Sequence, residues 1–330
     1  MKVDFVVTWV DGTDAVWQSK KRATSEIDNQ MGNANSDSRF RDMDIFQYWF
    51  RTVEKYSPWV NRIYLITDNQ VPKWLNVNHP KLCVIDHSDI IQSTNLPTFN
   101  SNSIELSIPE IQDLSEHFVL FNDDTFINRP MDKADFFDEN GLPRDSKSYN
   151  MIVPTGDFQH IPFNNVALIN KLFSKGDLFE NLWNLFKTKN FRPIIKHLLS
   201  YPASGIAGFY DYHMPISYRK SNFLLLRNKF KKQWYSTIAH PFRTTADISH
   251  LLVRYYQLET RQYSFRNPKL NKLYSIEAAD MIAKDIAQET HYLIDINDND
   301  SLDDLEFNNY IRTVKTAYDS KLPDKSSFEL

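Results

Sequence analysis

The chain has 330 residues, of which 42% are hydrophobic and 14% aromatic, and this composition excludes a mainly disordered protein. Its formal net charge of only −4 gives no signal for a nucleic-acid partner, so any charge argument must be local. The single cysteine, Cys83, excludes an internal disulfide and a cysteine-based metal cluster, which favours a reducing compartment.

The N-terminal run MKVDFVVTWVDG is too short and too acidic for a secretory signal, and no run reaches the roughly 18 apolar residues of a spanning helix. Residues 3–10 are apolar and β-branched and end at Asp11-Gly12, which predicts a central strand followed by a turn. Residues 18–38 are polar without periodicity, and we expect a loop there. Asp42 could cap a helix that ends before Pro58. Five apolar residues would share one face of that helix: Ile45, Phe46, Trp49, Phe50 and Val53.

Further strands are expected at 62–67, 82–85 and 118–121. Asn102, with Glu105 three residues later, has the form of a capped helix start leading into the last of these strands. Strands that alternate with helices in this order predict an α/β fold. We expect a mostly parallel, Rossmann-like (GT-A-like) nucleotide-binding sheet flanked by helices.

The pattern becomes helical after about residue 165 and again over 245–290. The sequence therefore predicts a division into three parts. They are an α/β catalytic domain of residues 1–160 and 206–300, a helical insertion of 161–205, and a C-terminal helix and tail of 301–330.

Polar residues stop the apolar strand 118–121 abruptly at Asn122, Asp123 and Asp124. Oxygen ligands at a strand end suit a hard cation such as Mg²⁺ or Mn²⁺, and ligands of parallel sheets bind beyond the carboxyl ends of the strands. Asn122 and Asp124 would share one face, with Asp123 opposed unless the strand has already turned. The alternative is a simple turn, because Asn and Asp favour turns.

Other candidates also have plain structural alternatives. Arg39 and Arg41 precede a predicted helix start, where they could hold a phosphate or could be two solvated arginines. His213 lies before a proline and could be a general base or a structural histidine. Arg243 could offer its charge to an anion or belong to a capped helix start. The basic and aromatic stretch 228–235 is compatible with an anionic membrane surface, although a solvated face is its alternative.

Together these segments resemble the Stealth family, bacterial capsular or exopolysaccharide hexose-1-phosphate transferases related to the animal lysosomal-enzyme N-acetylglucosamine-1-phosphotransferase. DFVVTWVDGTD looks like the first conserved region of the family. The stretches 38–75, LPTFNSNSIEL and LSEHFVLFNDDTFINRP are similar to the second region. HMPISYRKS with PFRTTADIS resembles the third region, and YLIDINDND resembles the fourth.

The resemblance implies a site and a cofactor. The metal, Mg²⁺ or Mn²⁺, would be bound by Asp123, Asp124 and Asn122. Catalytic roles are expected for His213, Asp11, Arg243 and Glu105, although Glu105 could also be only a capping residue. Substrate binding is expected for Arg41, Asn100, Asp42 and Arg39.

The function implied is transfer of a hexose- or N-acetylhexosamine-1-phosphate from a nucleotide sugar, UDP-linked, to a saccharide hydroxyl, with release of UMP. The acceptor would be a saccharide or a lipid-linked oligosaccharide. The resemblance further suggests a cytoplasmic location, with room for peripheral contact with the membrane and with other polysaccharide-assembly enzymes. Two alternatives stay open: a metal-dependent glycosyltransferase that releases UDP, and a saccharide-binding scaffold without catalysis.

Overall fold

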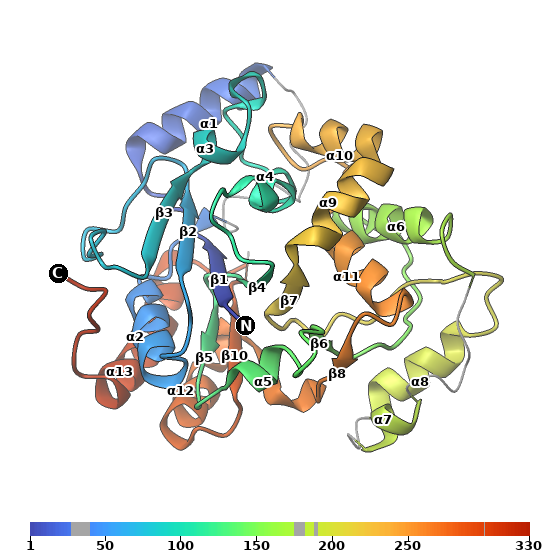
Figure 1. Ribbon diagram of the computed structural model, residues 1–330. Coiled ribbons are helices and arrows are strands. Elements are labelled where there is room, and N and C mark those ends of the chain that lie inside the picture. The colour runs from blue at the N-terminus through green and yellow to red at the C-terminus, as the bar shows by residue number, and fades with distance from the viewer. Residues whose placement is uncertain (28–39, 175–181, 188–190, 300) are drawn as a thin grey trace.

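A five-stranded sheet forms the centre of the molecule, seen in a computed structural model that describes residues 1–27, 40–174, 182–187, 191–299 and 301–330 (Figure 1). In spatial order its strands are β3 (Leu82–Asp86), β2 (Ile63–Thr67), β1 (Val3–Thr8), β4 (His117–Phe121) and β7 (Ile216–Arg219). The first four are parallel, and β7 adds an antiparallel edge. The prediction of a mostly parallel, Rossmann-like sheet is confirmed.

Helices cover both faces of this sheet, because the central strand is apolar on both sides. Successive residues of β1 point in opposite directions, so that Phe5 and Val7 enter one core while Val6 enters the other. The first core packs under α2 (Phe46–Tyr56), α12 (Ala279–Gln288) and α13 (Asp304–Lys321). The second packs under α4 (Ser101–Ser107), α6 (Asp157–Ile169), α9 (Lys220–Lys229), α10 (Lys231–Ile238) and α11 (Leu251–Glu259).

A second, smaller sheet brings the C-terminal part of the chain to the end of β4. Its strands, in spatial order, are β5 (Thr125–Ile127), β10 (Leu293–Asn297) and β9 (Asn271–Ser275). A two-stranded ladder joins β6 (Arg144–Asp145) to β8 (Ser264–Phe265). The other helices are α1 (Ala15–Ile27), α3 (His87–Ile90), α5 (Lys133–Phe136), α7 (Leu182–Lys187) and α8 (Phe191–Ser200). Short 3-10 turns are η3 (Ser93–Asn95), η4 (Ile108–Glu110), η5 (Pro268–Leu270) and η6 (Ile276–Ala278).

The predicted loop 18–38 is wrong over its first ten residues, because α1 continues to Ile27. Asp14 accepts a hydrogen bond from the Trp17 backbone N–H at 2.7 Å, which caps the start of this helix. The Trp17 ring is then buried against Phe40 and Phe99. Residues 28–39 lie outside the described part of the chain.

Two capping predictions are corrected by the structure. The N-cap of α2 is Ile45 and makes no side-chain cap, while Asp42 accepts from the backbone N–H of Asp44 at 3.0 Å. The N-cap of α4 is Asn100, which accepts from the Asn102 N–H at 3.1 Å, two residues earlier than predicted. The apolar face predicted for α2 is confirmed, because all five of its residues belong to the first core.

The second half of the chain is less uniformly helical than its sequence pattern suggests. Two strands, β8 and β9, interrupt the expected helical stretch 245–290. Within the proposed insertion, α6 packs into the second core, whereas α7 and α8 share a separate small core of Leu182, Leu185 and Ile194. The predicted division into domains stays a prediction.

One buried ion pair should be critical for stability. Arg254 of α11 donates to both carboxylate oxygens of Asp145 at 2.7 and 3.0 Å, and both side chains are buried. We expect Arg254→Met to lower the free energy of unfolding by about 3–5 kcal/mol, because it leaves a buried carboxylate unpaired. Urea denaturation measures this, with Arg219→Met as the control. Arg219 pairs with Glu116 near the surface, so its loss should cost less than about 1 kcal/mol. Equal losses in the two variants would contradict the assignment.

Candidate active site

The strand order creates a switch point between β1 and β4. The chain adds β2 and β3 on one side of β1 and returns to place β4 on the other. Val7 is in register with Phe121, so Asp11 and the residues after β4 leave the sheet at the same edge. Ligands of open α/β sheets bind in the crevice at such a point.

Residues 122–124 form a tight turn from β4 into β5, in which the Thr125 N–H donates to the Asn122 carbonyl at 3.3 Å. The turn alternative is therefore correct as local geometry, and strict strand alternation does not apply. Asn122 is exposed, whereas Asp123 and Asp124 are half-buried. The turn thus holds two neighbouring carboxylates at the edge of the core.

Burial is the main cause of raised pKa values among the carboxylates at this edge, and neighbouring negative charges add to it for Asp123 and Asp42. Burial, then the charges of Asp124 and Asp42, hold the pKa of Asp123 well above its usual range. Burial also raises the pKa of Asp124 to about 6, although the Thr125 hydroxyl and the nearby His213 act in the opposite direction. For Asp42, burial is again the largest cause of a raised pKa, and Asp44 and Asp11 add to it. The site therefore gathers several carboxylates, and few positively charged groups lie near enough to balance them.

A further carboxylate comes from the second sheet. Asp295 of β10 lies opposite Thr125 in the antiparallel ladder, and the next residue, Ile296, donates its N–H to the Asp124 carbonyl at 3.0 Å. Among the described residues Asp295 Oδ1 is buried without a hydrogen-bond partner. Burial, then the charges of Asp124 and Asp211, hold the pKa of Asp295 well above its usual range. Asp295 is not among the predicted site residues, although it lies in YLIDINDND, the stretch that resembles the fourth conserved region, and is an acid inside the apolar run LIDIN.

These carboxylates fit the cation expected from the sequence. An orphaned buried oxygen of Asp295 beside two crowded aspartates is a donor set that hard divalent cations prefer. Within the described ranges, no group of three His, Cys, Asp or Glu side chains already stands in a coordinating arrangement. Mg²⁺ commonly takes one or two carboxylates and completes its shell with water and substrate phosphates, so a partial set is compatible with it.

His213 stands beside the acidic turn on an unusual backbone. Its φ of 47° lies in the left-handed region, which non-glycine residues rarely adopt. Asp211 accepts from the His213 N–H at 3.0 Å, and the Asn271 amide donates to the His213 carbonyl. Burial works to raise the pKa of Asp211, but His213 and Arg254 outweigh it and hold that pKa below its usual value. The imidazole of His213 is exposed, and its charge acts on Asp124 of the acidic turn.

A second pair of titratable side chains joins Glu105 of α4 to His250, the N-cap residue of α11. The Glu105 carboxylate is 3.5 Å from His250 Nε2, and the other ring nitrogen of His250 is 2.7 Å from the Tyr218 hydroxyl. Burial raises the pKa of Glu105, while the charges of His250 and Arg243 act against it. Glu105 is therefore not the capping residue of the alternative prediction. Sequence reasoning missed His250, which carries no motif of its own.

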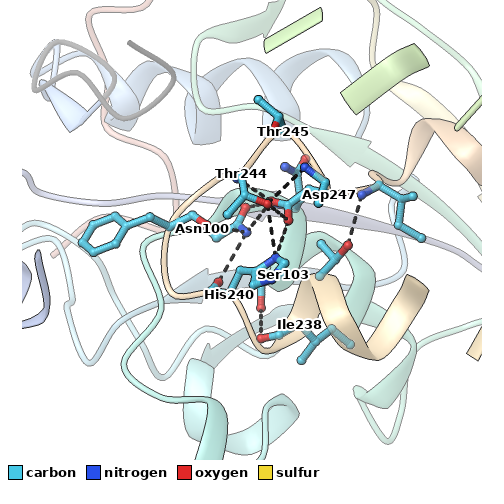
Figure 2. A network of polar contacts seen from close by, with 12 residues as sticks. Asn100, Ser103, Ile238, His240, Thr244, Thr245 and Asp247 are labelled. Atoms are coloured by element: carbon cyan, nitrogen blue, oxygen red, sulfur yellow. Dashed lines mark hydrogen bonds and ion pairs between the residues drawn. The ribbon is translucent and has the colours of Figure 1, made fainter. Parts of the chain in front are cut away.

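Asn100 holds the loop between His240 and Asp247, as Figure 2 shows, and Arg243 belongs to this loop. Its amide NH₂ donates to Asp247 at 2.8 Å and to two carbonyls of the loop, and its amide oxygen caps α4. Asp247 also accepts from His240 at 2.6 Å and from the Thr244 hydroxyl at 2.9 Å. Because the Asn100 side chain is fully buried, we infer that it acts by positioning this loop.

The loop carries Arg243 to the start of α4, where its guanidinium donates to the Ser101 hydroxyl at 2.7 Å.

The other predicted site residues lie elsewhere. Arg41 stacks on the Phe307 ring with 4.5 Å between guanidinium carbon and ring centroid, and lies 3.6 Å from the Asp298 carboxylate. Asp11 accepts from the N–H and the hydroxyl of Thr13 at 2.8 and 2.6 Å. Arg39 falls outside the described residues. The structure therefore links Asp11 to Asp42 and the acidic turn, and Arg243 to Glu105, while Arg41 reaches toward the C-terminal segment.

A Rossmann-like sheet that gathers carboxylates at its switch point, with a histidine beside them, is typical of an enzyme that binds a charged ligand there. The family comparison gives the particular class. Models of Stealth conserved regions 1, 2 and 3 match residues 1–28, 39–145 and 212–256. The chain belongs to the Stealth family.

Curated relatives match over nearly the whole chain. The exopolysaccharide phosphotransferase cps2G of Lactiplantibacillus plantarum is 44% identical over 99% of this chain and 96% of its own length. The capsular polysaccharide phosphotransferase WcwK of Streptococcus pneumoniae is 42% identical over 99% and 98%. The receptor polysaccharide phosphotransferase WefC of Streptococcus oralis is 38% identical over 100% and 99%. The predictions of the family and of an enzyme of the phosphotransferase class are confirmed.

A solved structure of the bifunctional glycosyltransferase WbbM aligns with 98% of this chain and 52% of that chain, at 10% identity. Its TM-score of 0.38 is too low to support an inference. Among the helices that the structure describes, none combines the length and apolar character needed to cross a bilayer.

A direct test of the cation site is thermal unfolding with and without Mn²⁺ or Mg²⁺. We expect the cation to stabilise the wild type by about 3 kcal/mol at roughly a hundred times its Kd, because it binds the folded state and relieves the repulsion between Asp123 and Asp124. Asp123→Asn and Asp124→Asn should each lose most of this gain. The control Asp113→Asn changes an exposed carboxylate and should keep it. An unchanged gain in the two site variants would disprove the assignment.

Proposed function

We propose that this protein transfers a hexose-1-phosphate or N-acetylhexosamine-1-phosphate from a UDP-linked sugar to a saccharide hydroxyl, with release of UMP. The product is a phosphodiester-linked capsular or cell-surface polysaccharide. The observation that carries the proposal is the set of crowded carboxylates at the β1 and β4 ends, since it suits a cation-bound diphosphate better than a neutral ligand. The names of the curated relatives support the same class of reaction.

His213 is the proposed general base. Its imidazole is exposed beside Asp124, where an acceptor hydroxyl could approach from solvent. The imidazole takes the hydroxyl proton as the acceptor oxygen forms a bond to the phosphorus next to the sugar. The bond between that phosphorus and the bridging oxygen breaks, and UMP leaves with the bridging oxygen. The anomeric bond of the sugar stays intact.

Positive groups around the site would balance the charge of the transferring phosphoryl group. In enzymatic phosphoryl transfer, positioning and electrostatic stabilisation supply most of the rate acceleration. Arg243 is the best placed of these, because its loop is fixed by the Asn100 and Asp247 network. Arg41 would need to give up its 3.6 Å contact with Asp298 to reach a phosphate. Asp123, Asp124 and Asp295 would hold the Mg²⁺ or Mn²⁺ ion, which neutralises diphosphate charge when bound.

The acceptor is proposed to be a growing saccharide, free or linked to a lipid. The names of the relatives refer to exopolysaccharide, capsular polysaccharide and receptor polysaccharide, which are all polymers. Other polysaccharide-assembly enzymes would then supply the acceptor to this protein.

The nucleotide released decides the reaction type. Purified protein is incubated with a panel of UDP-sugars, an oligosaccharide acceptor and Mg²⁺ or Mn²⁺, with a chelated sample as the control. We expect UMP to appear together with a phosphodiester product, and both to disappear with the chelator. UDP would instead mean that the sugar alone had moved. Acceptor binding without release of either nucleotide would favour the scaffold alternative.

A single substitution can test His213 as the general base without disturbing its left-handed backbone. His213→Asn keeps a residue that tolerates the left-handed backbone but removes the imidazole. We expect kcat to fall by about 10²–10⁴, the usual contribution of a general base, while the free energy of unfolding changes by less than about 0.5 kcal/mol. His160→Asn, which changes a histidine of α6, is the matched control and should keep its rate. Full activity of His213→Asn would rule out the base.

A further inference from the structure

Two helices remote in sequence from the site motifs present apolar side chains to solvent. α7 and α8 pack together through a small core of Leu182, Leu185 and Ile194, and Figure 1 shows them at the margin of the fold. On α8, Phe191, Ile195, Leu198 and Leu199 are 66%, 53%, 43% and 68% exposed. We call these four residues the outer face of α8.

The spacing of the outer face is that of an amphipathic helix turned toward solvent. Its four residues stand at positions i, i+4, i+7 and i+8, which share one side of a helix. The buried residues of α8 lie on the other side and include Pro193, His197 and Ser200. A surface helix of a globular protein normally directs its apolar stripe toward the core, and α8 directs a second one outward.

The inner side of α8 is firmly attached to the body. His197 is 1% exposed, accepts from the Tyr149 N–H at 3.0 Å and stacks on the Tyr149 ring with centroids 5.1 Å apart. Tyr149 belongs to the second core of the main sheet. The outer face is consequently held outward by a fixed helix and does not depend on a rearrangement of α8.

Basic charge accompanies the apolar side chains. α8 carries two basic residues, Arg192 and Lys196, and the sequence of residues 182–200 has no aspartate or glutamate, in a chain whose net charge is −4. Arg192 and Lys196 are four residues apart on α8 and border the outer face. On α7, Trp183 and Phe186 are also exposed, at 72% and 50%, and are spaced to share one side of the helix.

We propose that the outer face of α8, with the exposed residues of α7, docks on an anionic phospholipid bilayer. Exposed aliphatic and aromatic side chains bordered by Lys and Arg are the pattern of a helix that lies in the membrane interface. Each basic residue near such a surface is attracted to it, and the apolar side chains enter the boundary between headgroups and acyl chains. The charge complementarity selects the bilayer over a neutral partner surface. This docking would bring the protein to a surface without a spanning helix.

Vesicle binding tests the proposal on the full-length protein. The probes are vesicles of phosphatidylglycerol with phosphatidylcholine, and vesicles of phosphatidylcholine alone, both without nucleotide sugar or lipid-linked saccharide. We expect flotation with the anionic vesicles only, and weaker binding as sodium chloride is raised. Because no catalytic substrate is present, failure of this test is distinguishable from failure of the proposed transferase function.

Paired variants separate the apolar and the charged contributions. The double variant Phe191→Ser with Leu199→Ser should bind anionic vesicles about tenfold more weakly, whereas Leu305→Ser, on the equally exposed start of α13, should bind as the wild type does. Arg192→Glu with Lys196→Glu should lose about fivefold for each charge removed. Arg312→Glu, on α13, is the control for this charge variant and should bind as the wild type does. The side chains are exposed except that of Lys196, which is half-buried with its ammonium 5.2 Å from the centroid of the Tyr210 ring. Thermal unfolding of each variant therefore checks that it folds, and we expect changes of less than about 1 kcal/mol.

A site-specific label reports the orientation. The variant Cys83→Ser with Leu199→Cys carries a single environment-sensitive fluorophore, and its emission should rise on addition of anionic vesicles. The same label at Leu305→Cys should not respond. Equal binding by wild type and the Phe191 and Leu199 double variant would overturn the proposal. So would a dimer in light scattering that the same variant converts to a monomer, because the face would then be covered by a second copy.

Discussion

Repulsion between carboxylates is the constraint on which the site depends. Asp123 and Asp124 occupy a tight turn between Phe121 and Phe126, and both phenylalanine side chains are fully buried. The core therefore fixes the two ends of the turn, and the acids cannot move apart to lower their energy. Asp42 and Asp295 add further negative charge from other parts of the chain. Such an arrangement costs stability in the absence of a counterion, and strain of this kind is typical of binding sites.

The remaining site residues come from distant segments that the fold brings to one edge. β10 reaches Asp124 only because it pairs with β5, and the loop with Arg243 reaches α4 only because Asn100 and Asp247 hold it. Both connections use buried hydrogen bonds. These hydrogen bonds fix where Asp295 and Arg243 lie relative to the rest of the site, while Asp295 Oδ1 itself keeps no partner among the described residues.

At His213, too, the residues that hold the backbone differ from the group that is available for chemistry. Its left-handed backbone is held by Asp211 on one side and Asn271 on the other, which leaves the imidazole exposed. The support residues need not touch a substrate to matter, since a misplaced base loses its reach to the proton. The outward apolar face of α8 lies in a different part of the chain, with its own attachment through His197, so docking and chemistry can be varied separately.

The sequence alone determined a mostly parallel sheet of strands alternating with helices, the apolar face of α2 and the acidic ends of β1 and β4, because local periodicity and abrupt changes in polarity encode them. The motif resemblance determined the family. Tertiary structure decided what depends on pairing between distant segments: the place of Asp295 opposite Thr125, the contact of His250 with Glu105, and the use of Asn100 to hold a loop. It also decided that Trp17 packs on Phe40 and Phe99, which makes a helix of residues that appear to be a polar loop. Long-range contacts leave no local pattern, so no periodicity in the chain could reveal them.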